Sequence, residues 1–409
     1  MNEHTASPVT VRPLTEDDLP AFVGVLAEAF LVDDLEAVEQ SERAVFEPGR
    51  AFGAFIDGEL VGTSEALTKH ITLPGVGPSP VAAITSVAVR PDRTRRGALS
   101  SMLRTILHGL HESGAEPISA LWASESVIYG RFGYGHATDT VRTAVRSKAA
   151  LRADVPVSAE PVRLVPREQA VPRLRAIYDE LSPGRVGNLA RTDRSWEFVL
   201  MDIPSTRKGS SALRFAMHPD GYAVYATEAS WRDSRPTGSL AVHELVARDP
   251  AARAALLRFV LDVDLVSEVT LTIGTDDPLP HLLADVRGAT RTVVDALWMR
   301  LVDVDRALEA RRYSTDVDVV LELTDEFCPW NAGRWRLRGG PAGATVERAD
   351  DASTDLAMDV TALGAAYLGG TRLSTLGATG RVQAKDPAVL AAASAALAVD
   401  PAPVCTEAF

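Results

Sequence analysis

An arginine-rich turn beside a glycine is the part of this sequence whose residue types most clearly suit binding chemistry. The segment SVAVRPDRTRRGALSSML, Ser86 to Leu103, passes from strand-forming residues through a turn to the start of a helix. Such a turn presents unpaired backbone N–H groups and the positive end of the helix dipole. Gly97 lets the backbone approach a ligand closely, and Arg95 and Arg96 can add charge-assisted hydrogen bonds. The segment predicts a site for a small anion such as a diphosphate.

The charge balance of the whole chain makes this cluster stand out. The 409 residues include 42 Lys and Arg against 55 Asp and Glu, which gives a formal net charge of -13 at pH 7. The segment and the residue after it contain five arginines and only one acidic residue, Asp92; the arginines are Arg90, Arg93, Arg95, Arg96 and Arg104. An acidic chain repels phosphate backbones, so we expect no nucleic-acid binding and a preference for cationic partners. Taken alone, the arginines are also compatible with an ordinary solvated surface.

A glycine-punctuated loop, VIYGRFGYG, supplies a second group that can do chemistry. Its Tyr129 carries a phenol with an ordinary pKa of about 10, which can donate a proton to a leaving group when its oxygen lies close to it. The alternative for Tyr129 is a packed aromatic ring, and we interpret Tyr134 as a core or wall residue.

The elements that must position these groups can be read from the pattern of the chain. A strand near Val9 is followed by a helix with Thr15 before its acidic first turn and apolar positions up to Phe30. Asp57-Gly58 indicates a hairpin. The sequence AAITSVAV predicts a strand, and residues 97–114 predict an amphipathic helix. The expected order is β-α-β-β-β-α-β, followed by the tyrosine loop.

A second unit, beginning near Thr140, repeats this layout. The sequence HPDGYAVYAT has a turn entering a strand, and residues 240–262 read as a strand followed by a helix. Aligning the two copies places Ala252 to Ala255 where the first has its Arg-Arg-Gly turn, which indicates a duplicated fold that has lost the anion site. A third segment from about Asp303 reads as a small α+β domain.

These motifs resemble the GCN5-related N-acetyltransferases (GNATs), and more closely the enhanced-intracellular-survival (Eis) type. The resemblance rests on VAVRPDRTRRGALSSML, LWASESVIYGRFGYG and the final TEAF, and it extends through HPDGYAVY, CPWNAGRWRL and AAYLGGTRLSTL over nearly the full chain. It implies a mixed α+β protein with a catalytic GNAT domain at 1–145, a degenerate GNAT-like domain at 146–302 and a sterol-carrier-protein-like domain at 303–409.

The resemblance also implies a reaction and its residues. The donor is acetyl-CoA, with a contact set of Val87, Ala88, Val89, Arg95, Arg96, Gly97, Ala98, Leu99, Ser100, Ser124 and Glu125. Tyr129 is the implied general acid. The α-carboxylate of Phe409, where 409 is the natural end, is the implied general base, and Asp33 and Glu407 are the implied contacts of a cationic substrate. Thr94 and Leu99 depart from the general superfamily turn, although the Eis-type pattern accepts leucine at the last position.

The expected function is therefore acetyl-CoA-dependent N-acetylation of primary amines in polycationic substrates such as aminoglycosides, with lysine side chains as further candidates. The alternative is a carrier or sensor that binds an acyl-CoA or a lipid. The family's hexamers imply a homohexamer. Cys328 and Cys405 are far apart and His108 and His111 suggest no third ligand, so we expect no metal. The chain has no secretory core or apolar run of about 18 residues, so we expect a cytoplasmic protein without membrane contact.

Overall fold

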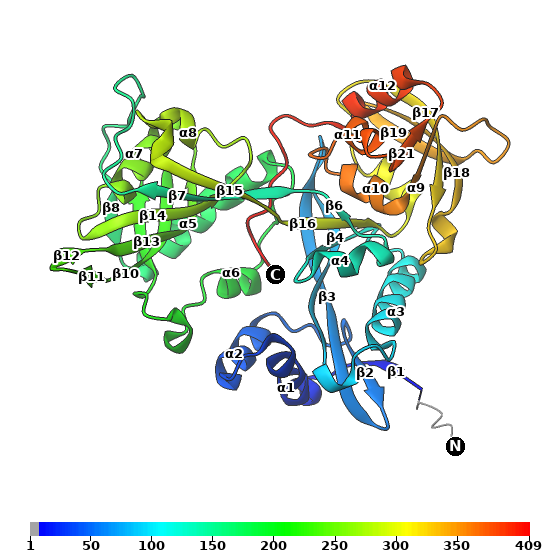
Figure 1. Cartoon of the computed structure of the whole chain (residues 1–409), viewed down its shortest axis with the longest axis horizontal. Helices are drawn as coiled ribbons and strands as arrows, with labels where there is room; N and C mark the ends of the chain where they lie inside the picture. Colours follow the sequence, from blue (N-terminus) through cyan, green and yellow to red (C-terminus); the bar gives the residue numbers. More distant parts are fainter. Residues whose placement is uncertain (1–7) are drawn as a thin grey trace.

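Two sheets with the same strand order form the larger part of the molecule (Figure 1). The computed structural model describes residues 8–409. The first sheet has the order β1 (Thr10–Pro13), β2 (Ala51–Ile56), β3 (Glu59–Leu73), β4 (Gly77–Val89), β5 (Ile118–Trp122), β16 (Leu297–Leu301) and β6 (Gly135–His136). Neighbouring strands run antiparallel, apart from the parallel pair β4 and β5.

The second sheet repeats this arrangement strand for strand. Its order is β8 (Arg163–Val165), β9 (Arg214–His218), β10 (Gly221–Glu228), β13 (Gly238–Ala247), β14 (Val266–Ile273), β7 (Asp139–Arg146) and β15 (Ala289–Asp295). Here β13 and β14 form the parallel pair, and the other neighbours are antiparallel. A short hairpin, β11 (Trp231–Arg232) and β12 (Arg235–Pro236), projects beyond it. The duplication indicated by the sequence is therefore present in the fold.

The two sheets are joined by strands that pass from one to the other. β6 lies in the first sheet and β7 in the second, whereas β15 lies in the second and β16 returns to the first. The domain boundaries expected after residues 145 and 302 therefore do not follow the sheets. They assign most of β7 to the first domain, although it lies in the second sheet, and β16 to the second domain, although it lies in the first sheet. Hydrogen bonding to β5 decides the place of β16, and this partner is not visible in the local sequence.

The longer helices of the first domain follow the expected signals, with one addition. Thr15 and Asp18 form a capping box ahead of α1 (Leu19–Phe30), and α3 (Ala98–Ser113) lies between Gly97 and Gly114 as expected. Asp57 and Gly58 form the hairpin turn. The added helix, α2 (Leu35–Val45), was not expected from the sequence, although Asp34 caps its first turn by accepting a hydrogen bond from the Ala37 amide.

Four helices belong to the second domain: α5 (Arg167–Leu181), α6 (Asp193–Val199), α7 (Pro250–Leu261) and α8 (Leu279–Leu282). The third domain has the sheet order β19 (Gly343–Arg348), β18 (Gly333–Gly340), β17 (Val317–Thr324), β20 (Leu356–Asp359) and β21 (Val382–Ala384). Its helices are α9 (Val304–Glu309), α10 (Val360–Ala366), α11 (Leu373–Ala378) and α12 (Pro387–Leu397).

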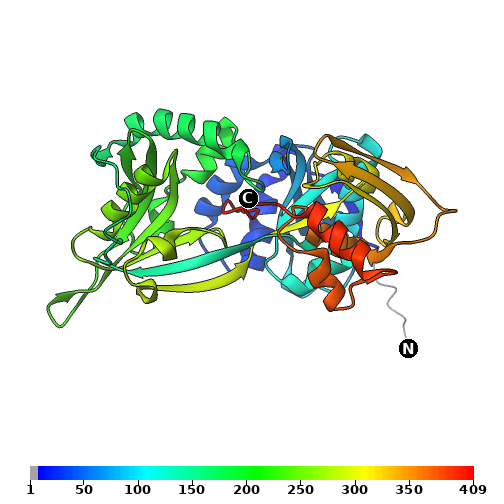
Figure 2. The ribbon, with the colours of Figure 1, turned by 90° about the horizontal axis from the view of Figure 1, so that it is seen from above.

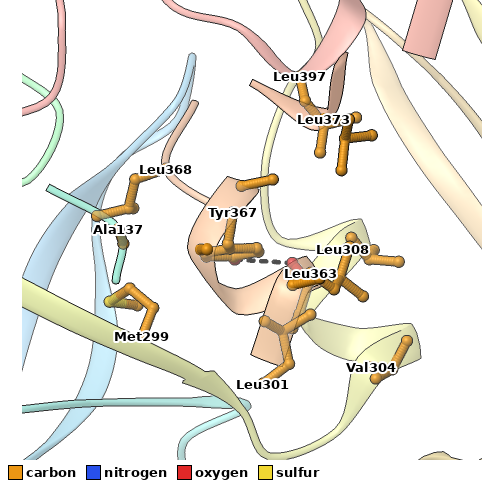
Figure 3. Close-up of a cluster of buried hydrophobic side chains, with 14 of the residues drawn as sticks. Ala137, Met299, Leu301, Val304, Leu308, Leu363, Tyr367, Leu368, Leu373 and Leu397 are labelled. Carbon is orange, nitrogen blue, oxygen red and sulfur yellow. Dashed lines mark hydrogen bonds between the residues drawn. The ribbon is translucent and has the colours of Figure 1, made fainter. Parts of the chain in front are cut away.

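The third domain shares a core with the first sheet. Figure 3 shows Met299 and Leu301 of β16 beside Leu363 and Tyr367, and all of them belong to one buried cluster. The hydroxyl of Tyr367 donates to the carbonyl of Ala307 at 2.8 Å. This packing fixes the start of the C-terminal tail, which leaves α12 and returns between the two large sheets (Figures 1 and 2).

Candidate active site

The first sheet opens at the parallel pair of strands. β4 and β5 pair only from Ala82 to Ile84 opposite residues 119–121, although β4 continues to Val89. Its other edge stays paired with β3, with a register shift opposite Ser86, whose φ is +50°. Beyond Ile84, the β5-facing edge of β4 can therefore pair with an extended ligand.

A cavity of about 280 Å3 lies in this opening and brings distant residues together. Its lining consists of Phe30, Ile84, Thr85, Ser86, Val87, Trp122, Ala123, Ser124, Tyr129 and Phe409. Val87, Ser124, Tyr129 and Phe409, all expected from the sequence, are among them. The cavity is thus enclosed by the end of α1, by β4, by the segment after β5, by α4 (Ser126–Tyr129) and by the C-terminal residue.

Tyr129 ends the short helix α4 and is 4% exposed. Burial raises the pKa of its phenol, partly offset by a hydrogen bond with Ser124, so the group stays protonated at neutral pH. A protonated phenol on the cavity wall can act as a proton donor. Tyr134 is fully buried and its hydroxyl lies 2.7 Å from that of Ser119, which agrees with a core role.

Phe409, at the C-terminus, also lines the cavity. The hydroxyl of Thr85 donates to a main-chain carboxyl oxygen of Phe409 at 2.7 Å, and its ring packs at the edge of the large hydrophobic core. The indole of Trp122 donates to the carbonyl of Glu407 at 3.0 Å. β4 and β5 therefore both hold the tail, and the terminal carboxylate lies where the two strands separate.

The anion site expected at the start of α3 has the required backbone. Gly97 caps the helix with φ +88°, and a Cβ built there would meet no atom within 4 Å. Within the described part of the chain, no side chain caps this helix end. The backbone of Ala98, Leu99 and Ser100 can therefore face an anion.

Fewer arginines of the cluster are available to bind an anion than the sequence suggested. Arg90 pairs with Glu28 and Glu59, and Arg93 pairs with Glu59 and Asp92. The guanidinium of Arg104 lies 4.6 Å from the centre of the Phe327 ring. Arg95 and Arg96 are exposed and pair with no carboxylate among residues 8–409, so these two remain as candidate anion contacts.

The corresponding helix end in the second domain is closed. The carboxylate of Asp249 accepts hydrogen bonds from the amides of Ala251 and Ala252, each at 2.8 Å, at the first turn of α7. A carboxylate from the chain itself thus occupies the place that an anionic ligand would take. This adds a physical reason to the missing glycine for regarding the second copy as degenerate.

The two expected substrate contacts lie in different surroundings. Asp33 is exposed in the loop between α1 and α2, and its neighbour Asp34 is committed to capping α2. Glu407 does not line the candidate active-site cavity; it lines a separate cavity in the second domain, so its side chain lies elsewhere than expected. Its carboxylate is 7% exposed and accepts a hydrogen bond from Arg191 Nε at 2.6 Å. Glu125, an expected donor contact, is exposed at the start of α4.

An acidic group that no sequence pattern had singled out lies behind the cavity wall. The hydroxyl of Ser86 donates to Glu42 of α2 at 2.9 Å. Burial raises the pKa of Glu42 to about 7, and the hydrogen bond from Ser86 opposes this rise. Burial likewise raises the pKa of Glu65 to about 8, with Glu42 and Glu47 as further acidic neighbours. The only sequence signal was the helix cap at Asp34, which places Glu42 on α2.

No helix within residues 8–409 is both long and apolar enough to span a bilayer. The same residues contain no group of three or more His, Cys, Asp or Glu side chains arranged to hold a metal ion.

Comparisons with known proteins give three consecutive matches to family models. Residues 10–137 and 187–304 each match an acetyltransferase (GNAT) domain, and residues 304–406 match a sterol carrier protein domain. An N-acetyltransferase of Streptomyces avermitilis, itself described as uncharacterized, is 40% identical over 98% of this chain and 99% of its own. N-acetyltransferase Eis of Mycobacterium tuberculosis is 35% identical over 96% of this chain and 97% of its own. The crystal structure of Eis1 from Mycobacterium abscessus has a TM-score of 0.85 and 33% identity, covering 98% and 100% of the two chains.

Proposed function

Because the chain belongs to the Eis-like family of GNAT N-acetyltransferases, we propose that it transfers the acetyl group of acetyl-CoA directly to primary amines of polycationic substrates. Aminoglycosides, at one or several positions, are the first candidates, and lysine side chains are the second. One observation carries the proposal: Tyr129, Val87 and Phe409 meet at one cavity in the opening of the first sheet.

The residues present fit the donor. An extended pantetheine arm can pair with the open edge of β4 at Val87 to Val89, and its diphosphate can accept from the uncapped amides at the start of α3. The open space beside Gly97 leaves room for that diphosphate, and Arg95 and Arg96 lie within the same turn. When bound, the donor supplies the thioester carbonyl carbon that is attacked.

The proposed chemistry uses two proton transfers. The Phe409 carboxylate accepts the proton that the ammonium group loses, so that the amine nitrogen can form a bond to the carbonyl carbon. Tyr129 donates its phenolic proton to the sulfur as the carbon–sulfur bond breaks. Thr85 orients the carboxylate through its 2.7 Å hydrogen bond. Both groups have the required charge state at neutral pH, because a carboxylate is ionised there and Tyr129 is kept protonated by burial.

A cationic substrate is supported by the charges around the site. The chain carries a net charge of -13, and Glu42, which contacts Ser86 of the cavity wall, adds negative charge to the extent that it is ionised around its pKa of about 7. A negative field in a cleft raises the local concentration of cations. The lipid-carrier alternative would need room within the third domain, where the interior is occupied by Tyr313, Tyr367 and Arg311, each at most 2% exposed.

Thiol release from acetyl-CoA, measured against a panel of aminoglycosides, polyamines and lysine peptides, tests this proposal. We expect turnover with polyamine-type substrates and little with neutral amines. Deleting residues 406–409 should abolish turnover while acetyl-CoA still binds. A protein that binds acetyl-CoA but releases no thiol with any amine of the panel would instead favour the sensor alternative.

A further inference from the structure

The second sheet opens in the same way as the first, but its opening contains the C-terminal tail. β13 and β14 pair only up to Val242 and Leu271, whereas β13 continues to Ala247. A cavity of about 410 Å3 lies beyond this point, and tail residues 404–407 form part of its lining. Figures 1 and 2 both show the tail running between the two sheets.

The tail is bound to the second domain at successive residues. The amide of Ala402 donates to Asp276 at 2.9 Å, and the amide of Val404 donates to the carbonyl of Val186 at 2.9 Å. Gly187 has φ +93°, and a Cβ built there would lie 2.5 Å from the carbonyl oxygen of Val404. The chain therefore needs glycine at 187 for the tail to approach this closely.

Arg191 attaches the tail to the second domain through charged groups. It donates through Nε to Glu407 at 2.6 Å and through Nη2 to Glu244 of β13 at 2.7 Å. Its guanidinium lies 3.8 Å from the centre of the Tyr178 ring and 4.4 Å from that of Trp196. The Arg191 side chain is only 3% exposed. Burial alone would lower the pKa of Arg191, but the carboxylates of Glu244 and Glu407 raise it.

The charges in this cluster balance, as buried ions require. Glu407 also lies 4.0 Å from Lys69 Nζ, which donates to the hydroxyl of Ser195. Two cations, Arg191 and Lys69, therefore face two carboxylates, Glu407 and Glu244. Removing one partner leaves the others uncompensated in a poorly solvated place, so the cluster holds Glu407 in a single arrangement.

Glu244 lies at the place in the second sheet that corresponds to the candidate active site in the first sheet. β13 has a register shift against β10 at His243, next to Glu244, just as β4 has one against β3 near Ser86. In the first domain this bulge borders the candidate active-site cavity. In the second domain the same place in the sheet carries the carboxylate that binds Arg191.

We infer that the opened sheet of the second domain binds the chain's own C-terminal tail, and that Arg191 is the positioning residue that fixes Phe409 at the active site. The catalytic part of this inference rests on the proposed role of the Phe409 carboxylate. Glu407, two residues before the terminus, is the attachment point. The degenerate domain thereby contributes to a reaction that takes place in the first domain.

The test uses full-length Arg191→Gln and Glu407→Gln, with Arg194→Gln as the matched control. Arg194 also joins the second domain to the first, by donating to the carbonyls of Ala44 and Phe46, but it contacts no tail residue. Three quantities are measured for each variant: hydrogen exchange of residues 402–409, kcat, and acetyl-CoA affinity. Glu407→Gln keeps the shape of the side chain, so it carries the test if Arg191→Gln does not fold.

We expect faster exchange in the tail and a fall in kcat of about 10²-fold in both variants, because displacement by about 1 Å can have such an effect. Acetyl-CoA affinity should stay within about twofold, Arg191→Lys should restore part of kcat, and Arg194→Gln should behave like the unmodified protein. Unchanged hydrogen exchange of the tail in both variants would show that Arg191 and Glu407 do not hold the tail on the second domain, and would overturn the inference.

Failure of the positioning claim and failure of the proposed base can be told apart. If deletion of residues 406–409 abolishes kcat but the variants with fast tail exchange keep full kcat, Arg191 does not position the carboxylate. If the deletion itself leaves kcat unchanged, the proposed base is wrong, and the exchange data still decide whether Arg191 holds the tail.

Discussion

Tyr129 and Phe409 are 280 positions apart in the sequence and meet at one cavity. Their types and environments, a buried phenol and a terminal carboxylate, match the two proton transfers that amide formation from a thioester requires. Glu407 illustrates the opposite case, because its side chain is turned away from this cavity by Arg191. A sequence can suggest which residue types suit the chemistry, but the direction of a side chain depends on partners such as Arg191 that lie far away along the chain.

Replacing Tyr129 by Phe tests the proposed acid. The ring and its packing remain while the proton donor is lost, so we expect kcat to fall by about 10²–10⁴-fold with acetyl-CoA affinity nearly unchanged. Steady-state kinetics and a calorimetric titration measure the two effects. Tyr134→Phe is the control, because Tyr134 hydrogen-bonds Ser119 within the core. Equal rates for Tyr129→Phe and the unmodified enzyme would rule out this role.

Glu65 gives a pH-dependent prediction for stability. Burial raises its pKa to about 8 in the folded protein, compared with an ordinary value of 4.5, so the folded state keeps its proton where the unfolded chain has lost it. The contribution of Glu65 to stability is thus complete below pH 4.5 and is lost as the pH rises towards 8. The slope for one such group is at most about 1.4 kcal/mol per pH unit.

Glu65→Gln mimics the protonated form, so we expect its melting temperature to decrease less between pH 5.5 and pH 8 than that of the unmodified protein. Thermal unfolding at the two pH values measures this difference. Some dependence should remain, because burial also raises the pKa of Glu42 to about 7. A parallel decrease in both proteins would show that Glu65 is ionised when folded.

At the scale of elements, the two strand–turn–helix units differ in what their helix ends can bind. α3 begins with Gly97 and an open turn, whereas α7 begins with amides that Asp249 already occupies. Local signals of this kind were readable in the sequence: the hairpin at Asp57-Gly58 and the bounds of α3 agree with their patterns. The place of β16 could not be read, because it depends on pairing with β5, about 180 residues earlier.

Gly97→Glu should abolish acetyl-CoA binding, because it places a carboxylate in the open space beside the start of α3. Any side chain at φ +88° is strained, so Gly97→Ala is the matched control: it has the same backbone strain without the added charge. Titration of both folded variants separates the two effects. Equal affinities for the two variants would contradict the placement of the diphosphate.

A titration of the unmodified protein with acetyl-CoA should give one site per chain. The first domain has the open helix end, and in the second Asp249 competes with any anion for the same amides. Isothermal calorimetry gives this number directly. Two equivalent sites would show that the capping aspartate does not exclude the ligand.

At the scale of the whole molecule, all three domains serve one site. The first provides the cavity, the third shares its core with β16 and starts the tail, and the second holds that tail through Arg191. The repeated layout and the distinct third segment were enough to anticipate three domains. The path of the tail between the two sheets was not contained in any local pattern, because it arises only when the domains pack together (Figure 2).

The measurement that tests this account most directly is the kcat of protein whose Phe409 carboxylate has been converted to an amide. Peptide ligation of the tail, with an unmodified carboxylate prepared in the same way as control, changes the charge and leaves the packing. We expect kcat to fall by about 10²-fold or more with acetyl-CoA affinity unchanged. If the amidated protein acetylates amines at the rate of the control, the terminal carboxylate is not the base, and the central claim is wrong.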